Sequence, residues 1–161
     1  MKKTKEELLV KLLMAKNMTI AFAESCTGGL CAATLINAEG ASNVIKESII
    51  TYSNEAKIKY LNVKNETIKK FGVVSNEVSL EMALGIKKEA LTDIGVGVTG
   101  YAGDYGDEFT KGQTVCVSIV INDKSYSYKN YYPNKSRNEI RQLTVSLVFT
   151  EILKLLGDSH E

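Results

Sequence analysis

A short polar segment near the N-terminus carries side chains that can do chemistry. It follows the apolar run MTIAFA (residues 18–23) without a polar linker. The segment consists of two hydroxyls, a thiol and two glycines: Ser25, Cys26, Thr27, Gly28 and Gly29. Free backbone N–H groups at a helix start bind anions, so this turn can hold a phosphate or the oxyanion formed when a serine attacks a carbonyl. Alternatively, Ser25 or Thr27 caps a helix and Cys26 is a small core residue.

A serine nucleophile needs a base, which is usually a histidine. The only histidine, His160, is one residue from the end of the sequence, which argues against a Ser-His-Asp triad. The segment TYSNEAK (residues 51–57) offers other partners, since Tyr52 ends a predicted strand and Lys57 falls in the first turn of a predicted helix. The helix dipole and desolvation there both disfavour the charged form of the lysine. The same spacing also describes a solvated lysine and a half-buried tyrosine.

Two further patterns suggest anion or nucleotide binding. Arg137 and Arg141 are one turn apart on the predicted last helix, so they can share a face and bind a phosphate, or form an ordinary solvated pair. Residues 95–100 match GxGxxG, but the first two glycines lie inside a predicted apolar strand. A dinucleotide fingerprint needs them between a strand and a helix, so we interpret them as sites of close packing.

Composition limits the possible classes of protein. The chain has 161 residues, 44% of them hydrophobic, which indicates one domain over residues 1–161. Its net charge of +1 and the lack of a long apolar run argue against nucleic-acid and membrane partners. Three cysteines without CxxC spacing favour a reduced, cytoplasmic setting, and a single histidine argues against a metal site.

Hydrophobic periodicity predicts alternating helices and strands. Helices are expected over about residues 5–15, 27–37, 54–60, 65–71, 76–91 and 136–156. Strands are expected over about residues 18–23, 46–53, 93–99, 113–121 and 125–132, the last two forming a hairpin. This order predicts a three-layer α/β/α sandwich with a mixed, mostly parallel sheet and a late antiparallel hairpin.

Five segments, in this order, resemble the C-terminal domain family of the competence/damage-inducible protein CinA: AESCTGG, TYSNEAK, GVVSNEV, GVTGYAG and KSRNEIR. The likeness covers about residues 5–156. It implies an α/β/α sandwich and a dimer. Active members are nicotinamide-nucleotide amidases, which convert nicotinamide mononucleotide to nicotinate mononucleotide and ammonia without a metal or a cofactor. The expected partner is therefore a small pyridine mononucleotide.

The resemblance also implies roles for individual residues. The family's catalytic serine, tyrosine and lysine fall on Ser25, Tyr52 and Lys57, with the serine attacking the carboxamide while the lysine, helped by the tyrosine, takes its proton. Oxyanion and phosphate binding are expected from a wider set: Thr27, Gly28, Gly29, Gly100, Ala102, Gly103, Arg137 and Arg141.

The loop after Gly103 departs from the family pattern. Members have a proline, a Gly-Gly-Thr run and a Lys-Pro-Val-Gly segment there, whereas this chain has DYGDEFTKGQ (residues 104–113). Its acids Asp104, Asp107 and Glu108 would repel a phosphate if they pointed inward. We expect them to point outward, and two alternatives stay open: a nucleotide-binding paralogue without turnover, or an amidase for another small carboxamide.

Overall fold

The computed structural model describes residues 2–157, so the sole histidine, His160, lies outside the described residues. The elements, in chain order, are α1 (Lys5–Lys16), β1 (Ile20–Glu24), α2 (Leu30–Leu35), a 3-10 helix (Ala41–Asn43), β2 (Ile45–Ile50), α3 (Asn54–Leu61), α4 (Asn65–Phe71), α5 (Asn76–Ala90), β3 (Ile94–Gly100), β4 (Thr114–Ile121), β5 (Lys124–Tyr131) and α6 (Arg137–Gly157).

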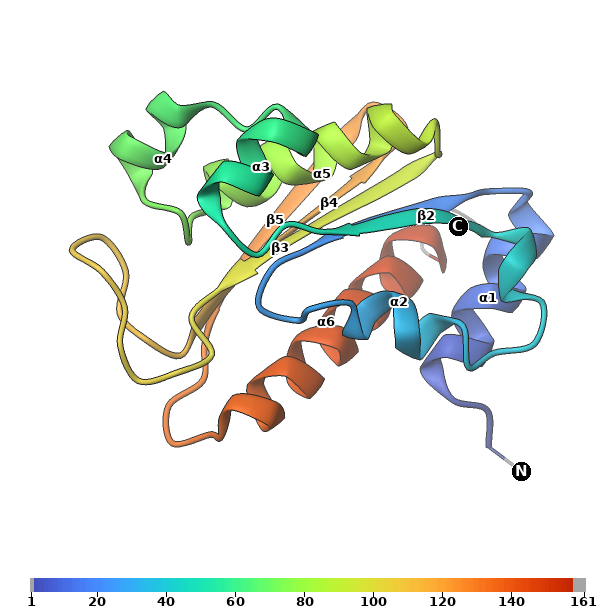
Figure 1. Ribbon diagram of the computed structural model, residues 1–161. Helices are drawn as coiled ribbons and strands as arrows, with labels where there is room; N and C mark the ends of the chain where they lie inside the picture. The colour runs from blue at the N-terminus through green and yellow to red at the C-terminus, as the bar shows by residue number, and fades with distance from the viewer. Residues whose placement is uncertain (1, 158–161) are drawn as a thin grey trace.

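The five strands form one mixed sheet in the order β2-β1-β3-β4-β5. The pairs β1–β2 and β1–β3 are parallel, and the pairs β3–β4 and β4–β5 are antiparallel. Four of the five strands thus run in one direction, with β4 reversed. Helices α1, α2 and α6 cover one face and α3, α4 and α5 the other, so the predicted three-layer α/β/α sandwich is confirmed (Figure 1).

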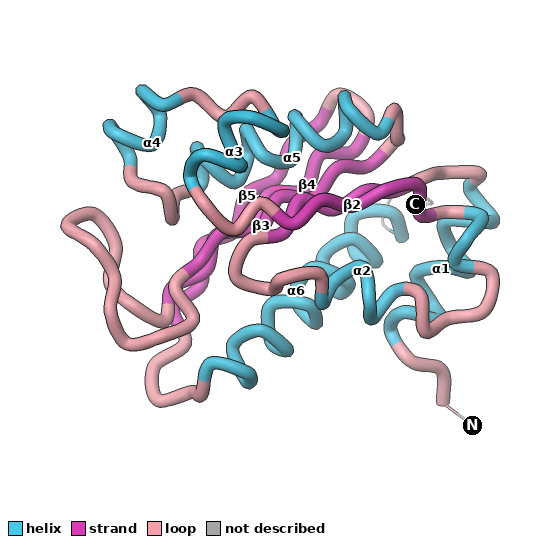
Figure 2. The backbone as a smooth tube through the Cα atoms, viewed as in Figure 1, coloured by secondary structure: helices cyan, strands magenta, loops and turns pink. Residues whose placement is uncertain are grey.

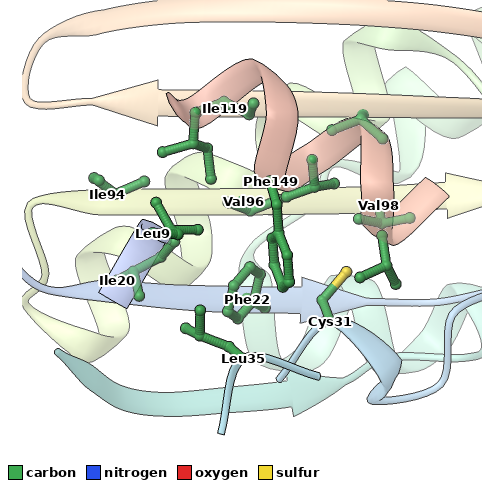
Figure 3. Packing of buried hydrophobic residues seen from close by; sticks show 14 of the residues in the cluster. Leu9, Ile20, Phe22, Cys31, Leu35, Ile94, Val96, Val98, Ile119 and Phe149 are labelled. Atoms are coloured by element: carbon green, nitrogen blue, oxygen red, sulfur yellow. The ribbon is translucent and has the colours of Figure 1, made fainter. Parts of the chain in front are cut away.

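Alternation along β1 divides its side chains between the two layers, because successive residues of a strand point to opposite faces. Ile20 and Phe22 lie in the larger core, beneath α1, α2 and α6, where the ring of Phe22 packs 6.4 Å from that of Phe149 (Figure 3). Ala21 and Ala23 lie in the smaller core against α5. All five residues of β1 are buried, as expected for a central parallel strand.

Local signals for the helix starts are mostly confirmed. The capping boxes of Thr4 with Glu7 and of Ser136 with Glu139 are both present, and Ser75 rather than Asn76 caps α5. The second helix is shorter than predicted. It begins at Leu30 because the two preceding glycines have positive φ angles, a conformation outside the helical region.

The glycines of β3 allow a helix to approach the sheet closely. An added Cβ at Gly95 or Gly97 would meet the backbone of α5, at the Ala83 and Ser79 carbonyls respectively. This confirms the interpretation of the GxGxxG match as a packing feature. The absence of side chains at Gly95 and Gly97 lets α5 pack tightly against the centre of the sheet.

The carboxyl ends of the parallel strands β1, β2 and β3 lie at one edge of the sheet. The connections that follow these strands gather at this end of the molecule, and the one after β3 is the long loop over residues 101–113 (Figure 2). Ligand sites of open α/β sheets lie outside the carboxyl ends of the strands. Within residues 2–157 no helix combines the length and apolarity needed to cross a bilayer.

The glycine packing predicts the effect of a single methyl group. Gly97→Ala should lower the free energy of unfolding by about 1–3 kcal/mol, because the methyl group collides with α5 backbone that cannot move freely. Gly157→Ala is the matched control, since nothing lies within 4 Å of its added Cβ. Urea denaturation measures both, and equal stabilities for the two variants would contradict the packing argument.

Candidate active site

Ser25 and Lys57 meet at the carboxyl ends of β1 and β2. The amide of Ser25 donates to the Val98 carbonyl of β3 at 3.0 Å, which fixes the residue directly after β1. Lys57 is in the first turn of α3, whose N-cap Ser53 accepts the amide of Ala56 at 3.0 Å. The Nζ atom of Lys57 lies 3.0 Å from Ser25 Oγ. Two residues that are far apart in the sequence therefore form one buried pair.

The amine of Lys57 is withdrawn from water. The residue is 1% exposed, and within the described residues it forms no ion pair. Besides Ser25, its Nζ contacts the main-chain carbonyls of Thr51 at 2.8 Å and Tyr52 at 3.5 Å. Burial lowers the pKa of Lys57 from 10.5 to about 8, with the Cys26 thiol opposing this to a smaller extent. Part of the population is therefore neutral near physiological pH.

The side chain of Tyr52 does not lie between the serine and the lysine. It is 65% exposed and lines the pocket described below, while the main-chain carbonyl of the same residue faces Lys57. Because Lys57 Nζ reaches Ser25 Oγ directly, proton transfer between them needs no intervening group, and help from the Tyr52 hydroxyl stays a prediction. The ring instead forms part of the wall that a ligand would contact.

The buried pair opens into a pocket of about 480 Å³. Its wall comes from five parts of the chain: Ser25, Tyr52, Asn54, Lys57, Val73, Val74, Thr99, Gly100, Tyr101, Ala102, Gly103, Asp104, Tyr105 and Arg137. Four predicted substrate-binding residues thus lie on the wall, namely Gly100, Ala102, Gly103 and Arg137.

Besides Asp104, six residues of the wall were not among the predicted site residues: Asn54, Val73, Val74, Thr99, Tyr101 and Tyr105. Hydroxyls hold the two valines in place: Thr99 donates to the Val73 carbonyl and Thr110 to the Val74 carbonyl, each at 3.0 Å. The segment GVVSNEV contains these valines, and its resemblance to the family was the only signal that could have pointed to them.

The other predicted substrate-binding residues lie away from the pocket wall. Gly28 and Gly29 have φ angles of 59° and 99°, so glycine is needed there for backbone conformation. An added Cβ at Gly29 would meet the Ile50 side chain at 3.2 Å, and one at Gly28 would face Arg141. Thr27 is fully buried. These three residues set the path of the chain after Ser25, and none of them lies on the pocket wall.

Arg141 is also not on the wall. Its guanidinium donates to the carbonyls of Cys26 at 3.1 Å and Thr27 at 2.9 Å, and to Asn138 Oδ1 at 3.2 Å. These contacts occupy the side chain with the protein itself. Of the two arginines predicted to bind a phosphate, only Arg137 lies on the pocket wall, and its role in binding stays a prediction.

Glu24 is a buried acid that the residue patterns did not single out. It is 0% exposed, and its carboxylate accepts the amides of Cys31 at 2.8 Å and Ala32 at 3.1 Å, in the first turn of α2. The expected caps, Ser25 or Thr27, do not fill this role. Glu24 could not be recognised as a cap from the sequence, because it lies seven residues before the Cys31 amide, a spacing outside the usual capping motifs.

The three acids of the unusual loop differ in placement. Asp107 turns back onto its own loop, where it accepts the Tyr101 hydroxyl at 2.9 Å and the amides of Phe109 and Thr110. Glu108 is exposed and away from the pocket wall. Asp104 is exposed and contributes to the pocket wall, so a place off the wall is observed for Asp107 and Glu108 only.

The geometry can support acyl transfer to a serine. Among residues 2–157 no cluster of His, Cys, Asp or Glu side chains fits a metal ion. The serine hydroxyl has a buried amine as its neighbour, and the backbone from Gly100 to Gly103 borders the same pocket. Burial raises the pKa of the adjacent Cys26 thiol to about 12, so this thiol is a poor nucleophile.

Comparison with known proteins identifies the family. The model of the CinA C-terminal domain matches residues 2–156, nearly the whole chain. The chain belongs to the CinA C-terminal domain family. A CinA-like protein of Petrotoga mobilis is 45% identical over 155 residues, which cover 96% of this chain and 38% of that protein. A putative competence-damage inducible protein of Clostridium botulinum is 49% identical over 143 residues, covering 88% of this chain and 34% of that protein.

Solved structures of CinA superfamily proteins share the fold. The competence or damage-inducible protein from Enterobacter asburiae superposes with a TM-score of 0.91 at 29% identity, covering 96% of this chain and 99% of that one. The competence/damage inducible protein CihA from Agrobacterium tumefaciens gives a TM-score of 0.86 at 31% identity, covering 98% of both chains. The chain spans little more than a third of the curated relatives' length but nearly all of these solved domains.

The buried amine of this CinA domain predicts how stability depends on pH. The pKa of Lys57 is about 8 in the folded protein and 10.5 in the unfolded chain. Between these values the unfolded state binds more protons, so the free energy of unfolding rises with pH. Below about pH 8 the cost of burying the charge is fully present. From pH 7 to pH 10, wild type should gain roughly 2–3 kcal/mol relative to Lys57→Met in urea denaturation. A difference that does not change with pH would contradict the buried amine.

Proposed function

We propose that the protein is a nicotinamide-nucleotide amidase that hydrolyses the carboxamide of nicotinamide mononucleotide to nicotinate mononucleotide and ammonia. One observation carries the proposal: the Ser25 hydroxyl lies 3.0 Å from an amine that is 1% exposed and whose pKa is lowered to about 8. A hydroxyl beside a partly neutral amine is an activated nucleophile. The resemblance of the motifs to the amidase family supplies the substrate.

The contacts of Lys57 suit a base that works as a neutral amine. A neutral amine has two N–H donors and one lone pair. The carbonyls of Thr51 and Tyr52 can accept the two hydrogens, which leaves the lone pair directed at the hydroxyl of Ser25. After proton transfer the ammonium has three donors, and the same three oxygens accept them. Both protonation states are thus satisfied without rearrangement of the site.

The reaction would proceed in two steps. In the first, Ser25 Oγ bonds to the carboxamide carbon while Lys57 takes the hydroxyl proton. The C–N bond then breaks, and Lys57 returns this proton to the leaving nitrogen, so that ammonia departs and an ester remains on the serine. In the second step, Lys57 takes a proton from water, which attacks the ester carbon, and the proton returns to Ser25 Oγ as nicotinate mononucleotide leaves.

The wall residues suit the remaining parts of such a substrate. The amide of Tyr101 donates to the Thr114 carbonyl, so the amides of Ala102 and Gly103 are the ones proposed for the developing oxyanion. The guanidinium of Arg137 is close enough to meet an added Cβ of Gly103 at 3.1 Å. The side chains of Val73, Val74 and Tyr52 provide apolar and aromatic surface for a pyridine ring. A phosphate beside Arg137 would complete the fit.

If Ser25 is the nucleophile, substitutions of Ser25 and of its neighbour Cys26 should have very different effects on turnover. Ser25→Ala should lower ammonia release from nicotinamide mononucleotide by roughly a thousandfold or more, because the attacking oxygen is lost. Cys26→Ala should keep turnover within a few-fold of wild type, since its thiol stays protonated. Both variants are assayed for ammonia and checked by urea denaturation. A Ser25→Ala protein that still turns over would exclude the proposed mechanism.

The position of Asp104 favours a second candidate function, an amidase for a small carboxamide without a phosphate. A carboxylate on the wall repels a phosphate by about 1 kcal/mol at partly exposed distances. If the mononucleotide is the substrate, Asp104→Asn should lower its KM by roughly fivefold and leave the dephosphorylated riboside unaffected. Glu108→Gln, in the same loop but off the wall, should change neither value. Faster wild-type turnover of the riboside than of the mononucleotide would favour the second candidate.

A further inference from the structure

Glu24 is an acid in the interior that the proposed reaction does not use. It is the last residue of β1, and its side chain lies on the same face of the sheet as Phe22, towards α2. Each of its two hydrogen bonds goes to an amide in the first turn of α2, Cys31 or Ala32. The carboxylate thus ties the end of the strand that carries Ser25 to the start of the next helix.

Arg141, on α6, contacts the turn that follows Glu24. It comes from the first part of α6, and its Nε and one terminal nitrogen donate to the carbonyls of Cys26 and Thr27. A second terminal nitrogen donates to Asn138, one turn earlier on the same helix, which orients the guanidinium. The planar, forked guanidinium binds two separate carbonyls in fixed directions, which a lysine ammonium cannot reproduce.

The turn between these two contacts is the one that begins at Ser25. Within this turn, Arg141 donates to the carbonyls of Cys26 and Thr27. Directly after it, Glu24 accepts the amides of Cys31 and Ala32 at the start of α2. Resting on the proposed amidase function, we propose that Glu24 and Arg141 are positioning residues that together hold Ser25 Oγ at hydrogen-bond distance from Lys57.

The base and the pocket wall are held by other parts of the chain. Lys57 is fixed by α3 and by the Thr51 carbonyl, and Arg137 and the loop over residues 100–105 reach the pocket without Glu24 or Arg141. Loosening the turn should therefore displace the nucleophile more than the base or the pocket wall. Catalytic rate should fall while substrate affinity is kept, whereas a residue that binds the phosphate would change KM.

Two conservative variants test this. Glu24→Gln keeps the size of the side chain but replaces one acceptor oxygen by an NH₂ group that faces a helix amide. Arg141→Lys keeps the charge but loses the fork. Each should lower kcat for nicotinamide mononucleotide at least tenfold, with KM within threefold of wild type. The double variant should lose about as much as the worse single variant, because both residues hold one turn.

Matched controls separate this effect from a general change of charge. Glu55→Gln removes an exposed acid from the first turn of α3, and Lys154→Arg exchanges basic side chains at an exposed position of α6. Both should keep wild-type kcat and KM. Urea denaturation is run on every variant. If Glu24→Gln does not fold, Arg141→Lys decides, because its side chain is only partly buried at the turn.

A second readout separates this proposal from the choice of substrate. A fluorophosphonate labels an activated serine: the Ser25 O–P bond forms, the P–F bond breaks, the proton goes to Lys57 and fluoride leaves. The labelling rate is followed by intact mass. If wild type is labelled but releases no ammonia, nicotinamide mononucleotide is not its substrate. In that case, labelling of both variants at least tenfold slower than that of wild type still supports the positioning role. Folded variants that keep wild-type kcat or labelling rate overturn it, as does a wild type that shows neither reaction.

Discussion

The burial of one amine is the constraint on which the rest of the site depends. An isolated charge in a protein interior is costly, and Lys57 has main-chain carbonyls and a hydroxyl around it rather than a carboxylate. Such partners satisfy its hydrogens without stabilising its charge as an acid would. The pKa of the amine therefore stays low, and the adjacent hydroxyl of Ser25 gains a base. A carboxylate in contact with Lys57 would stabilise the charged form and remove this property.

The fold brings the pair together through its parallel strands. Ser25 follows β1 and Lys57 follows β2, and the two strands are hydrogen-bonded neighbours. The link continues beyond the ladder, since the Thr51 amide donates to the Glu24 carbonyl at 2.8 Å and the Thr51 carbonyl accepts Lys57. A short hydrogen-bonded path thus connects the backbone of the nucleophile's strand to the base. Close packing of α5 on Gly95 and Gly97 keeps the neighbouring strand β3 in place.

Much of this could be predicted from the sequence because the signals were local. Apolar periodicity and capping boxes predicted the layers and most helix boundaries. The position of Lys57 in a first turn suggested a lowered pKa, but the structure gives burial as the cause, which the spacing alone could not distinguish from a solvated lysine. The contacts of Glu24 and Arg141 could not be predicted from local signals. Their partners are backbone groups, which have no residue type, and Arg141 reaches carbonyls more than a hundred residues away in the sequence. A pair of arginines one turn apart therefore looked like a phosphate site, although only Arg137 faces the pocket.

The central claim is that a neutral lysine activates the serine, and the pH dependence of turnover tests it most directly. Ammonia release from nicotinamide mononucleotide is measured from pH 6 to pH 10 for wild type and Lys57→Arg. For wild type, kcat/KM should rise about tenfold per pH unit and level off above about pH 8, where the amine loses its proton. Lys57→Arg keeps the charge but stays protonated, so it should be nearly inactive throughout. A flat wild-type profile, or an arginine variant with near wild-type turnover, would contradict the account.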